Sequence, residues 1–342
     1  MGDGRGGAGE EGGSRFGGGR EGSVLRADPL PEPERIHRFE HFVVGALGLG
    51  ARILPEPVAL FLGGVLGWMA GTVVRLRRRV VDENLKRAFP LQSAGWRAAV
   101  ARGSYFHLGR EAVTLLRFGA MGVREVRERT RTEGFETVRS LLERGEGLIM
   151  VSGHFGNWEI GGAAVAVRNI PLDVVAVRQT NPLFDRRVVR TRERLGMRVI
   201  EKKRAPAEVL RTLRRGGAVA LVADQNVRRG GIFVDFFGVP ASTARGPALF
   251  ALRTGAPIVV AFAFRLPGAR ARYRLRFEPL EIERTGEQEV DAGRLTRAFL
   301  QALEEAIREA PEQYFWLHRR WKTRPDPPAH ESPARGIPQE PR

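Results

Sequence analysis

The sequence of 342 residues contains no cysteine, and only three tyrosines and five methionines. Without cysteine, the chain cannot form a disulfide, a thiolate metal site or a cysteine nucleophile. It also lacks the G-x-S-x-G motif of serine hydrolases and the H-E-x-x-H motif of zinc proteases. Acidic residues are in the minority, with 39 Asp and Glu against 56 Lys and Arg, so the net charge is +17. The surface therefore favours anionic partners, such as nucleic acid, anionic lipid or an acidic carrier protein.

The two ends of the chain contain few aliphatic residues. Residues 1–34 are rich in glycine, arginine and glutamate, and residues 326–342 are rich in proline. Such segments cannot bury enough apolar surface to offset the loss of chain entropy, so we predict that both are disordered tails. The first also lacks the apolar region of a signal peptide. An RNA-binding role for its Gly/Arg tract is the alternative to a plain flexible tail.

One long apolar run stands out, "VALFLGGVLGWMAGTVV" at residues 58–74, which carries no charge and is followed by "RLRRR". As a helix it would span about 25 Å, less than the ~30 Å of a hydrocarbon core. We therefore expect residues 35–80 to anchor the protein in the cytoplasmic (inner) membrane, either by one short span or by a pair of helices dipping into one leaflet. The basic cluster would hold anionic headgroups on the cytoplasmic side, where the rest of the chain would lie. A buried core helix is the alternative.

From residue 81 onward the pattern is that of a soluble α/β domain. Helical periodicity runs through "GWRAAVARGSYFHLGREAVTLLRF", and a second helix, "RLTRAFLQALEEAIREAP", is expected to end at Pro311. Short apolar runs typical of strands recur between helices: "GLIMVSG", "DVVAVR", "GMRVI", "AVALVAD", "PIVVAFAF" and "YRLRFEPLEI". Strands that alternate with helices predict a central, mostly parallel sheet flanked by helices. The predicted fold class is therefore α/β over residues 81–325, with an N-terminal membrane-anchoring helix or helix pair.

His154 follows one of these strands in the stretch "VSGHFGNWEIGG". Loops at the carboxyl ends of parallel strands converge on one crevice, where ligands bind. In a continuous helix His154 and Glu159 would point to opposing sides, because five residues turn the helix by about 500°. The two can meet only if His154 lies in the loop before the helix and Glu159 in its first turns. The glycines around His154 and a capping Asn157 would permit this arrangement.

A carboxylate bound to one imidazole nitrogen fixes the tautomer and leaves the other nitrogen as a general base. This would be the histidine–carboxylate half of a catalytic triad, without a protein nucleophile. Ser152 lies too close to His154 in the chain for a covalent role. Such a base suits the activation of a substrate hydroxyl. A buried histidine bonded to a nearby carboxylate is the alternative.

The segment "GHFGNWE" is similar to the H-x4-D/E motif of glycerolipid-type acyltransferases. Further segments, in the same order along the chain, are "DENLKRAFP", "VRQTNPLFDRRVVRTRERLG", "ADQNVRRGGIFVDFFGVPASTARGPALFALRTGAPIVVAFAFR" and "PEQYFWLHRRWKTRP". Over about residues 40–325 the chain thus resembles the late acyltransferases of lipid A biosynthesis and their relatives, which include the phosphatidylinositol mannoside acyltransferase of mycobacteria.

The resemblance implies roles for individual residues. His154 would be the general base and Glu159 its orienting partner. Arg192 matches an arginine implicated in function, which could stabilise an oxyanion or clamp an acidic headgroup; a solvated helix face is the alternative. Asp224 matches a second acidic position and would orient a catalytic group or an arginine, or act as a structural hydrogen-bond acceptor. Arg178, at a strand end, is a further candidate for the substrate-binding site.

The implied reaction is transfer of an acyl chain from a thioester of acyl carrier protein or coenzyme A to a hydroxyl of a glycolipid, without a cofactor or a metal. Residues 185–217 contain 12 Lys and Arg against 4 Asp and Glu, which suits an acidic carrier protein or anionic membrane lipids. Nucleic acid is not an expected partner.

Several alternatives remain at this point. The acceptor could be a lipid A precursor, a phosphatidylinositol mannoside or another glycolipid or aminolipid. Water could replace the acceptor, which would make the protein a thioesterase. A protein without enzymatic activity that binds membranes or nucleic acid through its positive charge is the third possibility.

Overall fold

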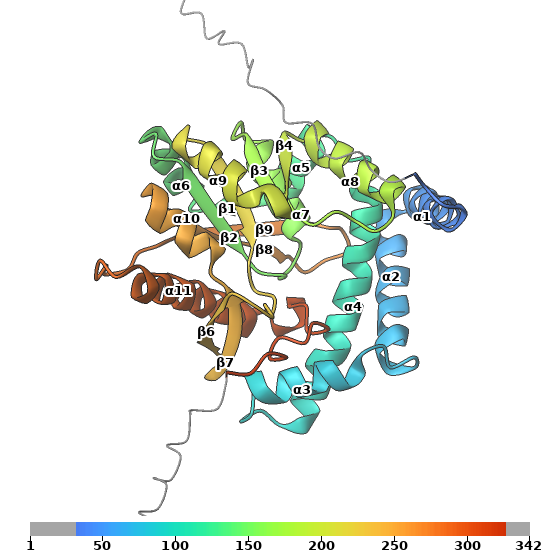
Figure 1. Cartoon of the computed structure of the whole chain (residues 1–342). Helices are drawn as coiled ribbons and strands as arrows, with labels where there is room; N and C mark the ends of the chain where they lie inside the picture. Colours follow the sequence, from blue (N-terminus) through green and yellow to red (C-terminus); the bar gives the residue numbers. More distant parts are fainter. Residues whose placement is uncertain (1–31, 326–342) are drawn as a thin grey trace, which may run out of the picture. The chain divides into compact units, whose positions relative to one another are not determined.

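The computed structural model of the protein describes residues 32–325 (Figure 1). Residues 1–31 and 326–342, which form most of the two predicted tails, lie outside the described residues. The helices are α1 (Arg35–Ile53), α2 (Glu56–Thr72), α3 (Arg78–Ala88), α4 (Ala94–Phe118), α5 (Val123–Arg129), α6 (Phe135–Glu143), α7 (Trp158–Ala166), α8 (Pro182–Arg194), α9 (Ala205–Arg214), α10 (Gly246–Thr254) and α11 (Gln288–Glu309).

The strands form a seven-stranded sheet and a separate hairpin. They are β1 (Thr130–Glu133), β2 (Leu148–Ser152), β3 (Leu172–Ala176), β4 (Met197–Glu201), β5 (Ala218–Val222), β6 (Gly231–Phe236), β7 (Val239–Ala244), β8 (Ile258–Arg265) and β9 (Tyr273–Leu280). The sheet order is β1-β9-β8-β2-β5-β3-β4. The five strands from β8 to β4 run parallel to one another, and only the β8–β9 pairing is antiparallel. The predicted α/β class with a mostly parallel sheet is therefore confirmed.

All six apolar runs that predicted strands are strands of this sheet, but three further strands were not predicted. The sequence of β1, "TRTE", has no apolar run, and it is a strand only because it pairs with β9. Strands β6 and β7 are joined at Phe237 and Gly238, with φ angles of 53° and 72°. Such a tight turn usually contains Asn-Gly or Asp-Gly, so Phe-Gly gave no hairpin signal.

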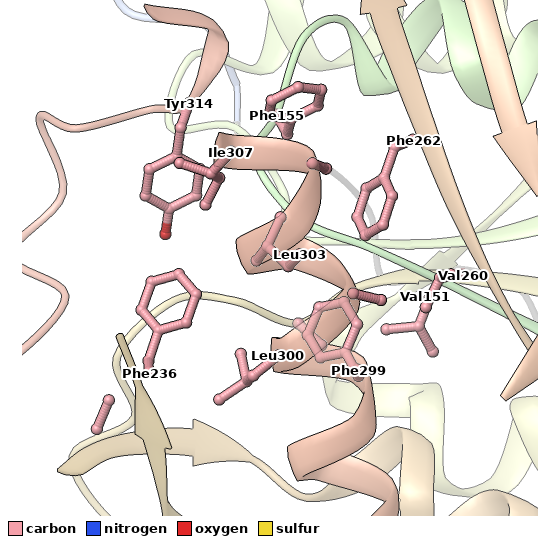
Figure 2. Packing of buried hydrophobic residues seen from close by; sticks show 14 of the residues in the cluster. Val151, Phe155, Phe236, Val260, Phe262, Phe299, Leu300, Leu303, Ile307 and Tyr314 are labelled. Carbon is pink, nitrogen blue, oxygen red and sulfur yellow. The ribbon is translucent and has the colours of Figure 1, made fainter. Parts of the chain in front are cut away.

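Hydrophobic side chains fill both faces of the sheet. One face is covered by α9, α10 and α11, and the other by α5, α6 and α7. Figure 2 shows the first core, in which Phe299, Leu300 and Leu303 of α11 lie between sheet residues such as Phe262 and the hairpin residue Phe236. Helices on both faces leave the strand ends as the accessible part of the sheet, as is usual for parallel sheets.

Helix α2 packs along α4 through a row of glycines (Figure 1). A Cβ atom at Gly67 would lie 2.1 Å from the carbonyl oxygen of Tyr105, and one at Gly63 would lie 2.7 Å from that of Gly109. Only glycine allows so close an approach of two helices. With the glycines turned inward, the bulky residues Phe61 and Leu66 point outward and are 62% and 66% exposed.

Large apolar side chains are also exposed along α1, including Phe39, Phe42, Leu47 and Ile53. The alternative of a buried core helix is therefore wrong for residues 58–74. Residues 35–72 contain two helices, α1 and α2. That they anchor the protein in a membrane stays a prediction. Within residues 32–325, no helix combines the length and the hydropathy that crossing a bilayer requires.

The loop after β2 is fixed at both sides by backbone hydrogen bonds. The Gly156 N–H donates to the Gln313 carbonyl at 2.9 Å, and the Asn157 N–H donates to the Ala263 carbonyl at 3.2 Å. Gly156 has a φ of 55°, and a Cβ atom there would lie 1.9 Å from the Ala263 oxygen. Asn157 then caps α7 by accepting from the Ile160 N–H at 2.9 Å, as predicted.

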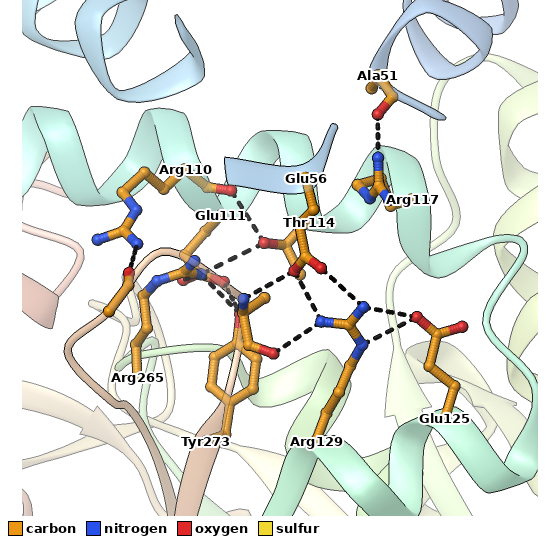
Figure 3. A network of polar contacts seen from close by, with 12 residues as sticks. Ala51, Glu56, Arg110, Glu111, Thr114, Arg117, Glu125, Arg129, Arg265 and Tyr273 are labelled. Carbon is orange, nitrogen blue, oxygen red and sulfur yellow. Dashed lines mark hydrogen bonds and ion pairs between the residues drawn. The ribbon is translucent and has the colours of Figure 1, made fainter. Parts of the chain in front are cut away.

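A buried polar network joins α4 to this loop. Figure 3 shows the part of the network that contains Glu111, Arg265 and Tyr273. Glu111 accepts hydrogen bonds from Arg265 at 2.6 Å, from the Tyr273 hydroxyl at 2.7 Å and from the Asn157 side chain at 2.6 Å. The Glu111 and Arg265 side chains are 7% and 3% exposed. A charge buried this deeply is tolerated only with such partners. The network therefore sets the position of the N-terminus of α7 relative to α4.

His107 on α4, next to this network, should make stability depend on pH. Burial lowers its pKa to about 4, against the attraction of Glu111. Between pH 6.5 and 4 the unfolded chain therefore binds a proton at this residue that the folded protein does not. We expect the free energy of unfolding to fall across this window by on the order of 3 kcal/mol from this residue. Urea titrations of the wild type and His107→Gln would measure it, and equal slopes would contradict the prediction.

Gly156→Ala should disrupt the loop after β2, since the added methyl meets backbone rather than a movable side chain. We expect a loss of about 3 kcal/mol of stability from the clash and the left-handed conformation together. Gly145→Ala is the matched control, because Gly145 has a φ of 75° with nothing within 4 Å of the added atom. It should lose only about 1 kcal/mol. Thermal unfolding of the two variants compares them, and equal losses would show that the close approach is unimportant.

Candidate active site

His154 and Asp224 meet because their strands are neighbours in the sheet. Strands β2 and β5 pair in parallel with Ser152 opposite Val222. Each of the two residues lies two positions beyond this last pair, at the same edge of the sheet. The His154 Nδ1 atom lies 2.6 Å from Asp224 Oδ1. The expectation that His154 lies in the loop before α7 is met.

The other ring nitrogen of His154 faces Gln225, with 3.3 Å between the two Nε2 atoms. An amide N–H donated to this nitrogen requires a lone pair on it, which places the ring proton on Nδ1 beside Asp224. The ring also rests edge-on against Trp158 at 4.7 Å between centroids. The His154 side chain is 21% exposed. Its Nε2 is thus arranged as a hydrogen-bond acceptor at the edge of the cavity described below.

Asp224 is fully enclosed, with an exposed fraction of 1%. Burial by itself raises the pKa of its carboxyl, but the charge of His154 and hydrogen bonds from the His154 side chain and backbone hold the pKa below its usual value. Tyr314 lies close by, and burial together with the charge of Asp224 raises the pKa of its hydroxyl well above the usual value. The carboxylate therefore stays ionised beside a neutral tyrosine.

The C-terminal segment after α11 holds the Asp224 loop in place. The Asn226 N–H donates to His318 Nε2 at 3.0 Å, and the Asn226 side chain exchanges hydrogen bonds with Thr323. Asn84 of α3 donates to the carbonyls of Trp316 and His318 at 2.8 and 2.7 Å. The segments "DENLKRAFP" and "ADQN" thus each contact the segment "PEQYFWLHRRWKTRP", which supports the site.

Glu159 does not contact His154, so the predicted His154–Glu159 pair is replaced by two other pairs. The Glu159 carboxylate accepts from Arg192 Nε at 3.0 Å and from Arg192 Nη2 at 2.5 Å. Both side chains are largely buried, at 16% and 14% exposed. The reason is geometric: the pinned loop directs the His154 ring over the end of β5, where Asp224 already occupies Nδ1. Glu159, in the first turn of α7, instead faces α8.

Arg178 follows β3 and forms an ion pair with Glu201 at the end of β4, at 3.2 Å. It does not line the cavity that His154, Glu159 and Arg192 share. Its neighbours Val177 and Gln179 do line this cavity, so the loop after β3 reaches the site while the Arg178 side chain pairs with Glu201.

A cavity of about 680 Å³ opens at the carboxyl ends of β2, β3 and β5. His154, Glu159, Arg192 and Gln225 provide polar groups at its wall. Most of the remaining lining is apolar and comes from both faces of the sheet, including Met150, Val165, Leu172, Val174, Leu221 and Phe250. A large apolar cavity with a few convergent polar groups is typical of a small-molecule or lipid site.

Two contributors to the site were not predicted as site residues. Gln225 was read only as part of a family block, although its place beside Asp224 after a strand was a usable signal. Glu111 gave no signal, because it lies in the middle of a long helix and finds its partners only in the folded chain. Among residues 32–325, no three His, Asp or Glu side chains are grouped so as to hold a metal ion.

Comparison with known proteins identifies the family. Residues 32–323 match the family described as bacterial lipid A biosynthesis acyltransferase. The chain is 29% identical over 286 residues to the lipid A biosynthesis palmitoleoyltransferase of Escherichia coli K12, which covers 83% of this chain and 91% of that protein. It is 28% identical, with the same coverage, to the lipid A biosynthesis lauroyltransferase of that organism.

A second group of relatives has a different name. The chain is 33% identical over 166 residues to the phosphatidylinositol mannoside acyltransferase of Mycolicibacterium smegmatis, over 47% of this chain and 53% of that protein. Both groups are acyltransferases, as the motifs of the sequence indicated. The chain belongs to the bacterial lipid A biosynthesis acyltransferase family and is an acyltransferase.

Proposed function

We propose that the protein moves a fatty acyl chain from a thioester to a hydroxyl group of a lipid A precursor or a related glycolipid. The observation that carries this proposal is a histidine with one nitrogen on a buried carboxylate and the other turned toward a largely apolar cavity. The names of the relatives support the reaction class and the kind of acceptor. A phosphatidylinositol mannoside is the alternative acceptor, and the mycobacterial relative favours it.

His154 would act as the general base in this reaction. Its Nε2 takes the proton of the acceptor hydroxyl while the oxygen forms a bond to the thioester carbon. The carbon–sulfur bond then breaks, and the departing thiolate receives the proton from the imidazolium. In the contacts observed, Asp224 rather than Glu159 is the group that would orient the ring and stabilise its positive charge.

Glu159 and Arg192 would position the substrate, and they would not orient the His154 ring. Their bidentate ion pair occupies Nε and Nη2 of the guanidinium and leaves Nη1 without a Glu159 contact. From the wall of the cavity, Arg192 could contact an anionic group of the acceptor or the oxyanion of the intermediate. The apolar lining would hold the acyl chain. Arg178 would lie outside the reacting centre.

The acyl donor would be an acyl carrier protein or coenzyme A thioester. Residues 185–217 carry the excess of basic residues noted in the sequence, and Arg192 and Lys202 within this segment line the cavity. A carrier protein docked there would deliver its thioester close to His154, and its acidic surface would favour the encounter. Release of thiol without an acceptor would instead indicate a thioesterase.

Double-mutant cycles can test whether His154 acts with Asp224 and Glu159 acts with Arg192. Asp224→Asn should lower kcat/KM by about a thousandfold, because the ring loses its anionic partner and the required tautomer. Its effect should be non-additive with that of His154→Ala. The effect of Glu159→Gln should instead be shared with that of Arg192→Gln. The assay follows thiol release together with the mass of lipid A precursor and phosphatidylinositol mannoside acceptors.

The same assay contains the outcomes that would contradict the proposal. Near wild-type rates in Asp224→Asn would remove Asp224 from the mechanism. If Glu159→Gln proved non-additive with His154→Ala, the two would act together despite their separate contacts. Thiol release without any gain in acceptor mass would favour hydrolysis.

Helices α1 and α2 would hold the protein at the cytoplasmic face of the inner membrane. Phe42→Ser/Phe61→Ser/Leu66→Ser should weaken binding to phospholipid vesicles by about a hundredfold, since three large apolar side chains lose their burial in lipid. A matched control, Leu91→Ser/Val123→Ser/Val290→Ser, removes three apolar side chains that are exposed elsewhere. Vesicle flotation measures both variants, and equal losses would contradict the role of the helix pair.

A further inference from the structure

A second hollow, of about 760 Å³, is lined by residues of the turn between α2 and α3 and of segments close to it. Six arginines line it: Arg75, Arg77, Arg78, Arg79, Arg102 and Arg319. They come from the α2–α3 turn, from α3, from α4 and from the C-terminal segment. We call this site the arginine hollow. Folding thus brings together cations that lie more than 200 residues apart in the chain.

Within residues 32–325, the positive charge of the arginine hollow is only partly neutralised. Asp82 is the one acidic residue in its lining, and it is paired with Arg78 at 2.9 Å. Arg77 donates to the Leu317 carbonyl at 3.2 Å. Among residues 32–325, the other four arginines have no hydrogen bond or ion pair from their side chains. Like charges held together in this way repel one another, so a bound anion would relieve a cost that the fold otherwise bears.

The backbone that carries the arginines is strained. Arg75 and Arg77 have φ angles of 57° and 50°, a left-handed conformation that costs a residue with a long side chain about 1 kcal/mol or more. Leu76 lies between them and is held by two hydrogen bonds: its N–H donates to the Ala70 carbonyl at 2.9 Å, and its carbonyl accepts from the Tyr105 hydroxyl. The contacts around Leu76 therefore maintain a backbone turn in which the side chains of Arg75 and Arg77 both line the hollow.

Exposed apolar residues flank Arg75 in the chain, and we call them the apolar rim. Val73 and Val74 before it and Leu76 after it are 66%, 73% and 51% exposed. A purely hydrophilic anion would leave this rim in water. An anion with attached hydrocarbon would cover it, and the guanidinium fork matches the oxygens of a phosphate.

We propose that the arginine hollow binds the phosphate group of an anionic lipid whose acyl chains lie against the apolar rim. The site is separate from the cavity at His154, and the two share no lining residue. The inference shares with the proposed function the placement of α1 and α2 at a lipid surface, but it does not depend on acyl transfer.

The test uses the full chain in detergent and the variant Arg75→Gln/Arg79→Gln/Arg102→Gln. Its control, Arg131→Gln/Arg253→Gln/Arg284→Gln, removes the same charge from exposed positions on β1, on α10 and after β9. The first probe is monomeric dihexanoyl phosphatidic acid, compared by calorimetry with dihexanoyl phosphatidylcholine and inorganic phosphate. The second is binding to phosphatidylcholine vesicles with and without phosphatidic acid.

We expect saturable binding of the phosphatidic acid, weaker binding of inorganic phosphate and no binding of the phosphatidylcholine. The hollow variant should lose about a hundredfold in affinity for the acidic vesicles, a factor of about five for each arginine, and the control much less. Arg75→Lys/Arg79→Lys/Arg102→Lys should keep its affinity for the acidic vesicles but bind the monomeric phosphatidic acid more weakly, because lysine lacks the guanidinium fork. This second variant keeps the test valid if the glutamine variant unfolds.

Three results would overturn the proposal. If the hollow and control variants lost equal affinity for the acidic vesicles, the effect would come from net charge and not from the hollow. If inorganic phosphate bound as tightly as phosphatidic acid, the hollow would be a site for phosphate and not for a lipid. An oligonucleotide that binds more tightly than phosphatidic acid, and is lost in the hollow variant, would assign the site to nucleic acid. His154→Ala should bind like the wild type, so failure of the acyl-transfer assay and failure of this test are distinguishable.

Discussion

The hydrogen bond between His154 and Asp224 depends on the pairing of two parallel strands, and much of the structure serves to hold it. Strands β2 and β5 bring the two residues to the same level at one edge of the sheet. Helices on both faces bury the strands and leave that edge accessible. The loop after β2 is then pinned to β8 and to Gln313, which holds the backbone that carries His154 in place next to Asp224. A buried ionised group requires this degree of fixation, because its partner must remain in place.

A second set of buried charges connects the site to the rest of the protein. Glu111 lies on α4, the helix on which α2 packs, and it also holds Asn157 at the start of α7. The apolar helix pair and the loop with His154 are therefore attached to the same long helix through glycine contacts on one side and a charge network on the other (Figures 1 and 3). This attachment would give a lipid-bound helix pair a fixed orientation relative to the cavity.

The arrangement separates three kinds of recognition. Apolar side chains are exposed along α1 and α2, a hollow of arginines lies at the α2–α3 turn, and the cavity at His154 is apolar with a few polar groups at its wall. An acyl thioester, a phosphorylated lipid and a membrane surface each match one of these surfaces in chemistry. Acyl transfer between two amphiphiles requires such a division, because the reacting hydroxyl and thioester must meet while the hydrocarbon of both remains shielded from water.

The sequence by itself determined the α/β class, six of the strands, the loop position of His154 and the cap at Asn157, because each depends on local periodicity or on local backbone preference. It also indicated the family, through motifs whose order the chain retains. Only the tertiary structure decided which carboxylate contacts His154. The spacing of His154 and Glu159 favoured a local partner, whereas strand order placed Asp224, 70 residues away, on the ring and left Glu159 to Arg192. Strand order, the Phe237–Gly238 turn and the partners of Glu111 arise from contacts between distant segments, and a single sequence carries no periodicity that reports them.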